Sequence, residues 1–166
     1  MFVYATKVTV KKVAAGVLVL AAVLWGISAL RPDPAQTATV AGDAGISQKL
    51  ESNEARVQFL QSYGWEVSAE PTEQTEVRIP DTFDETYESY NALQQSQGLD
   101  LTAYQGRKAD LYVYEVYNDP SGQSGVTANL VLYRNRLIAA DICSAEKDGF
   151  LRTVTQGPEQ ATDQAE

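Results

Sequence analysis

The order of apolar and polar residues divides the chain into an apolar run, a polar connector and a patterned body. Residues 13–30 form 18 consecutive uncharged positions, all apolar, small or aromatic except Ser28. As a helix this run would be about 27 Å long, close to the hydrocarbon thickness of a bilayer. The pattern predicts a single transmembrane helix at 13–30, preceded by a short cytoplasmic segment at 1–12 that contains three lysines.

A cleaved export signal is the alternative interpretation of the same run. Its apolar core is longer than a signal peptide needs, and no Ala-x-Ala site lies near its end, although Ile27-Ser28-Ala29 is a weaker site. We therefore expect residues 1–29 to be retained as an anchor that contacts membrane lipid through 13–30. The preceding lysines predict a single-pass protein of the cell membrane, with the amino terminus in the cytoplasm and the body outside.

Two helical patterns open the body. Ser52 can cap a helix over "NEARVQFLQSY", and Gly64 is placed to end it. After the extended segments "WEVSAE" and "TEVRIP", Asp81 can cap a second helix over "TFDETYESYNALQQSQ", which Gly98 ends. These signals predict two helices separated by extended chain.

The period then changes to two, which is typical of strands. Strands are predicted in "ADLYVYEVYN", "VTANLVLY", "RLIAADICS" and "DGFLRTV", with a tight hairpin at Arg134-Asn135. The expected fold class is α+β, with two helices packed on one face of an antiparallel strand meander. We expect a flexible stalk at 31–50, a domain at 51–154 and a disordered tail at 155–166.

The charge is strongly asymmetric. All 22 acidic residues follow Leu30, together with 10 basic residues, so this part carries a net charge of −12. Such a body is repelled by nucleic-acid phosphates and by anionic lipid headgroups, and no nucleic-acid partner is expected.

The usual catalytic and cofactor-binding patterns are missing from the sequence. The chain has no histidine, one cysteine and no glycine-rich phosphate loop. This composition excludes histidine-assisted nucleophiles and the common zinc sites, so we expect no cofactor, no metal and no catalytic residue. Cys143 lies in an apolar run, where a buried thiol is expected and a reactive one is the alternative.

Carboxylates are the remaining candidates for chemistry. Four of them crowd the start of the second helix, where the positive helix end stabilises them without any ligand: Asp81, Asp84, Glu85 and Glu88. Asp141 lies within a predicted strand and Asp148 precedes a glycine. Either could face a pocket, but edge and turn roles are commoner.

Aromatic residues provide the candidate binding surface. We expect the strand meander and the Gly64-Trp65 turn to contact a partner through Trp65, Tyr112, Tyr114 and Tyr133. Cross-strand aromatic packing is the alternative and the commoner origin of such a pattern. The basic pairs Arg107-Lys108 and Arg134 with Arg136 mark turns and strand ends, where solvated charge is normal.

Three segments, "ARVQFLQSYGWEV", "IPDTFDETYESYN" and "ANLVLYRNRLIAADICSAEKDGF", together with a single span behind basic residues, resemble a known family. It is the Gram-positive membrane-anchored domain-of-unknown-function family numbered forty-eight thirty, and the resemblance covers roughly residues 52–152. The resemblance implies an anchored extracytoplasmic domain. It implies no activity, cofactor or catalytic residue.

These observations predict a non-catalytic, membrane-anchored extracytoplasmic module that binds a protein partner or a cell-envelope component. One alternative is a carboxylate-dependent hydrolase that acts on envelope glycan or peptide, which requires a cleft with two carboxyl groups. The other is a structural subunit of a membrane complex.

Overall fold

The computed structural model describes residues 46–161. The predicted membrane span at 13–30 and most of the predicted stalk lie outside the described residues. Within 46–161, no helix combines the length and apolar character needed to cross a bilayer.

Five strands form one antiparallel meander in the order β1-β2-β3-β4-β5. The strands are β1 (Glu73–Arg78), β2 (Lys108–Glu115), β3 (Thr127–Tyr133), β4 (Arg136–Cys143) and β5 (Leu151–Arg152). The helices are α2 (Asn53–Ser62), α3 (Glu85–Ser96) and α4 (Gly157–Ala161), with 3-10 turns η3 (Thr102–Tyr104) and η4 (Val154–Gln156). The α+β class and the meander are as predicted.

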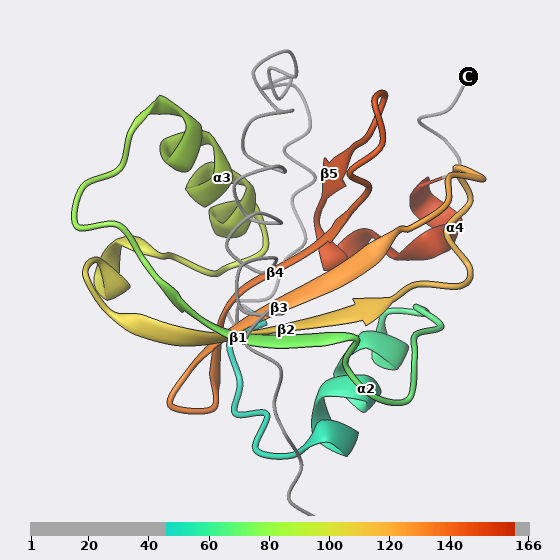
Figure 1. The fold of residues 1–166 in the computed structure, drawn as a ribbon, viewed down its shortest axis with the longest axis horizontal. Coiled ribbons are helices and arrows are strands. Elements are labelled where there is room, and N and C mark those ends of the chain that lie inside the picture. The colour runs from blue at the N-terminus through green and yellow to red at the C-terminus, as the bar shows by residue number, and fades with distance from the viewer. Residues whose placement is uncertain (1–45, 162–166) are drawn as a thin grey trace, which may run out of the picture.

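Helices α2 and α3 cover opposite faces of the sheet, whereas the sequence predicted both on one face (Figure 1). Leu60 of α2 belongs to the core cluster that contains Leu130, and Tyr90 of α3 belongs to the cluster that contains the adjacent Val131. Successive side chains of a strand point to opposite faces, so both faces of β3 are buried. The almost continuous apolar runs of β3 and β4 are typical of strands that are covered on both sides.

Side-chain caps define where the two main helices begin. Ser52 Oγ accepts a hydrogen bond from the Ala55 N–H at 3.2 Å, which confirms the predicted start of α2. The predicted cap of α3 is wrong, because Asp84 rather than Asp81 accepts the Tyr87 N–H, at 2.8 Å. Asp81 instead pairs with Arg78, with 3.2 Å between the charged atoms.

The β3–β4 hairpin has the predicted two-residue turn, and its backbone is unusual. Arg134 and Asn135 both have positive φ, at 50° and 64°. This is the pattern of a type I′ turn, whose twist matches that of the flanking strands. Asparagine tolerates the left-handed region, but arginine there costs about 1 kcal/mol.

The amino-terminal end of the described chain packs on the outer edge of β4. Leu137 N–H donates to Gln48 O at 2.9 Å, and Leu50 N–H donates to Asn135 O at 2.7 Å. Leu50 is 2% exposed, so it is part of the core. The stalk predicted at 31–50 therefore does not include residues 46–50, because their backbone groups cover a strand edge.

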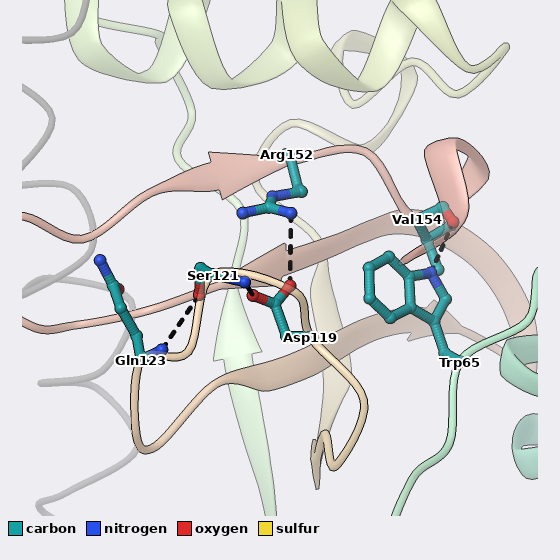
Figure 2. A network of polar contacts seen from close by, with 6 residues as sticks. All are labelled: Trp65, Asp119, Ser121, Gln123, Arg152 and Val154. Carbon is teal, nitrogen blue, oxygen red and sulfur yellow. Dashed lines mark hydrogen bonds and ion pairs between the residues drawn. The ribbon is translucent and has the colours of Figure 1, made fainter. Parts of the chain in front are cut away.

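The carboxyl-terminal end also packs on the domain. Trp65 Nε1 donates to Val154 O at 2.8 Å, and both side chains are fully buried (Figure 2). Gly157 adopts a φ of 66°, and a Cβ atom there would lie 2.8 Å from Tyr63 O. The predicted disordered tail is therefore wrong for residues 155–161, which form part of η4 and helix α4. Residues 162–166 lie outside the described part.

Candidate binding surface at the hairpin end of the sheet

The structure buries three of the four aromatic residues predicted to form a partner surface. Trp65 and Tyr114 are 0% exposed and Tyr112 is 8% exposed. Arg56 of α2 holds the two tyrosines, with its guanidinium 3.9 Å from the Tyr112 ring centroid and its Nε 2.9 Å from the Tyr114 hydroxyl oxygen. The prediction of an exposed surface at these three residues is therefore wrong, and their aromatic pattern reflects packing.

Tyr133 is the predicted aromatic residue that stays partly accessible. It lies at the end of β3, where its ring is 5.5 Å from that of Tyr104. The guanidinium of Arg134 lies over the same ring at 5.2 Å from its centroid. Two half-buried tyrosines and an exposed arginine thus form one cluster.

Antiparallel pairing brings this cluster together with other basic residues. We call residues 104–108 and 133–136 the hairpin end; in Figure 1 they lie on the yellow and orange segments at the same end of the sheet. Six of the nine lysines and arginines in 46–161 lie in the hairpin end or beside it: Lys49, Arg78, Arg107, Lys108, Arg134 and Arg136. The register explains this concentration, since the end of β1, the start of β2 and the β3–β4 turn all meet here.

Three of these cations are not neutralised by a neighbouring carboxylate. Lys108 Nζ lies 2.6 Å from Glu76 Oε1, and Lys49 and Arg78 also have acidic partners. Arg107, Arg134 and Arg136 are exposed and form no ion pair with the described part of the chain. The hairpin end therefore carries uncompensated positive charge on a domain that is acidic as a whole.

A separate polar cluster is buried between α3 and the sheet. Asp141 is 3% exposed; it accepts a hydrogen bond from the Tyr90 hydroxyl at 2.8 Å and one from Asn129 Nδ2 at 2.7 Å. Burial raises the pKa of Asp141 to about 6, although both hydrogen bonds oppose the shift. Within 46–161 no cation forms an ion pair with this carboxylate, so its ionised form is poorly stabilised.

Cys143 belongs to the same buried cluster. Its Sγ lies 3.3 Å from Thr127 Oγ1 and accepts a hydrogen bond from Asn129 Nδ2 at 3.1 Å. Burial, followed by the nearby Asp141 charge, raises the pKa of the thiol to about 11. The expectation of a buried cysteine is confirmed, and a thiol with this pKa is a poor nucleophile.

The opposite end of the domain has one strongly exposed aromatic side chain, Tyr117, at 61%. The loop that follows Tyr117 contains its own hydrogen bonds; Asp119 Oδ1 accepts one from the Ser121 N–H at 2.9 Å (Figure 2). Arg152 Nη1 lies 3.3 Å from Asp119 Oδ2, at ion-pair distance but outside hydrogen-bond geometry. This end therefore carries one exposed tyrosine and an internally hydrogen-bonded loop rather than a cluster of aromatic and basic side chains.

The other candidate carboxylates have structural roles. Asp84 caps α3, Asp81 pairs with Arg78, and Glu85 and Glu88 lie in the first turn of α3, where the positive helix end stabilises them. At Asp148 it is the backbone oxygen, not the carboxylate, that accepts a hydrogen bond from Gln123 Nε2 at 2.9 Å. Over residues 46–161, no three side chains of the cysteine, aspartate, glutamate or histidine type lie close enough together to hold a metal ion.

Taken together, the fold and the site define a small α+β domain with a five-stranded antiparallel meander, whose hairpin end carries exposed arginines and tyrosines. The chain belongs to the family described as domain of unknown function DUF4830, whose family model matches residues 59–142. The match runs from α2 to β4, a narrower stretch than the resemblance suggested. No curated protein and no solved structure matches the chain significantly.

Proposed function

We propose that this protein is a membrane-anchored, extracytoplasmic, non-catalytic module that binds a protein partner or an envelope component through its hairpin end. The carrying observation is the Tyr104–Tyr133 pair, 5.5 Å apart, flanked by three arginines that have no acidic partner among the described residues. Tyrosine and arginine are the residue types that most often supply binding energy at interfaces.

The backbone of Arg134 supports this assignment. Its φ of 50° is unfavourable for arginine, whereas glycine or asparagine would occupy the turn with less strain. Strained residues persist mostly at sites where the side chain serves a function. A charged side chain kept at a cost in stability, next to two tyrosines, is consistent with a binding role.

The test is site-specific photo-crosslinking in intact cells. A benzophenone amino acid replaces Tyr133 in one variant and Tyr117, at the opposite end, in the matched control. We expect crosslinked partners from position 133 and few from position 117. Equal yields, or no partner from position 133, would contradict the assignment of the binding surface.

The buried carboxylate favours the hydrolase alternative in one respect, since a pKa of about 6 suits a general acid. However, Asp141 is 3% exposed and its oxygens are occupied by Tyr90 and Asn129. A hydrolase would require a variant such as Asp141→Asn to abolish turnover of envelope glycan or peptide. A structural subunit would instead co-purify with integral membrane proteins and give no crosslink to a soluble or wall component.

A further inference from the structure

We propose that the hairpin end docks on anionic phospholipid headgroups of the membrane in which the chain is anchored. This inference rests on the anchoring and the binding surface of the proposed function, and it names the chemistry of the occupant. Arg107, Arg134 and Arg136 supply the charge, and Tyr104 and Tyr133 supply the amphipathic rings.

Charge complementarity is the first argument. At physiological ionic strength the Debye length is about 8 Å, so a membrane surface senses only the charges at the end that faces it. The three arginines project from that end without acidic partners in 46–161. The acidic residues at or beside this end, Glu51, Glu76, Asp81 and Asp110, are fewer than its six cations, so the end stays positive. Acidic residues that lie farther than a Debye length from the bilayer are screened.

The combination of residue types is the second argument. Tyrosine is enriched at membrane interfaces because its ring is apolar and its hydroxyl is polar. Arginine side chains extend their charged ends toward lipid phosphates and form bidentate contacts with them. The ring of Tyr133 contacts both the ring of Tyr104 and the guanidinium of Arg134, so these groups already form one compact surface.

The path of the chain is the third argument. The described chain enters the domain at Ile46, whose N–H donates to Gln97 O at 3.4 Å, and then runs along β4 to the hairpin, where Leu50 N–H donates to Asn135 O at 2.7 Å. Only residues 31–45 separate the predicted span from the described domain. Fifteen residues can extend to at most about 50 Å, so the hairpin end is always within reach of the membrane surface. A tether of this length gives even a weak contact a high effective concentration.

The experiment uses the full chain in lipid nanodiscs that contain a trace of headgroup-labelled quencher lipid. A fluorophore is placed at the hairpin end through Gln105→Cys, or at the opposite end through Lys147→Cys, both at exposed positions. The native Cys143 is buried and its thiol is poorly reactive, so it interferes little with labelling. One nanodisc contains only phosphatidylcholine, and the other contains one-third phosphatidylglycerol.

We expect at least twofold stronger quenching at position 105 in the anionic nanodisc, with no such change at position 147. The effect should disappear in 0.5 M salt and in the triple variant R107Q/R134Q/R136Q, whose folding is checked by circular dichroism. Equal quenching in both lipids, or an effect that survives the triple substitution, would overturn the lipid contact. If the lipid contact is overturned in this way but position 133 still crosslinks to a protein or wall partner in cells, the proposed function stands and only this inference fails.

Discussion

Replacement of Asp141 by asparagine should stabilise the protein at neutral pH and remove part of its pH dependence. The carboxylate is buried, is held by Tyr90 and Asn129, and has no cation beside it among residues 46–161. An asparagine at this position keeps the size of the side chain and can still accept from Asn129 and donate to the Tyr90 oxygen. It removes the negative charge that burial disfavours.

The magnitude follows from the pKa of this carboxyl group. The pKa of Asp141 is about 6 in the folded protein, against 3.8 for an unperturbed aspartate, so the folded state binds the proton more tightly than the unfolded state does. Each pKa unit corresponds to 1.36 kcal/mol, and the ionised carboxylate therefore costs about 3 kcal/mol of stability. Because the pKa is raised on folding, the ionised carboxylate does not reduce the unfolding free energy below pH 3.8. The unfolding free energy falls as the pH rises from 3.8 to 6 and is constant above that. About 2 kcal/mol of the cost should appear between pH 4 and pH 7.5.

The assay is urea unfolding of the full-length chain in a nonionic detergent, followed by near-ultraviolet circular dichroism from pH 4 to pH 8. The difference in unfolding free energy between Asp141→Asn and the wild type should grow in favour of the variant by about 2 kcal/mol over this range. Asp100→Asn provides a control of opposite sign when the measurement is extended below pH 4, because hydrogen bonds from Thr102 lower the pKa of Asp100 from its ordinary value of 3.8. The wild type loses the stabilisation from ionised Asp100 as the pH falls below 3.8, so the stability deficit of this variant relative to the wild type should shrink toward acidic pH.

A pH-independent difference between Asp141→Asn and the wild type would refute the reasoning, since it would mean that Asp141 titrates normally. A pH titration of the carbon-13 chemical shift of the Asp141 carboxyl group measures the pKa of this group in the folded protein directly. A midpoint near 4 in the folded protein would show that the buried environment does not penalise the charge.

Three further substitutions test other parts of the structure by the same unfolding measurement. Arg134→Gly should raise the unfolding free energy by about 0.5 to 1 kcal/mol by relieving the positive φ, while it weakens the lipid contact; a stability loss would contradict the strain. Arg56→Met should lower it by about 2 kcal/mol, because the Tyr114 hydroxyl loses a charged donor and the Tyr112 ring loses its cation. Gly157→Ala should lower it by about 1 to 2 kcal/mol, since the added Cβ would lie 2.8 Å from Tyr63 O; no change would show that the carboxyl-terminal segment is not packed as described.

Most of the fold could be predicted because its signals are local. The Ser52 cap, the glycine after α2 and the Arg134-Asn135 turn are each encoded within a few residues, and all three are confirmed. The side of the sheet on which each helix lies was predicted wrongly, since it depends on long-range packing. A signal was nevertheless present, because β3 and β4 are apolar at almost every position and strands of that kind are covered on both faces.

The candidate site was harder to predict because its residues are far apart in the sequence. Tyr104 and Tyr133 are separated by all of β2, the loop after it and nearly all of β3, and each basic pair alone resembles ordinary solvated charge at a turn. Only the strand register shows that these turns share one end of the sheet, and only the side-chain positions show that their arginines form no ion pair within the described residues. Tyr112 and Tyr114, which the sequence predicted to form a binding surface, are instead buried in the core. For an acidic domain, the arrangement of the few basic residues in space is therefore more informative about its partner than the net charge, because screening limits each contact to the charges that face it.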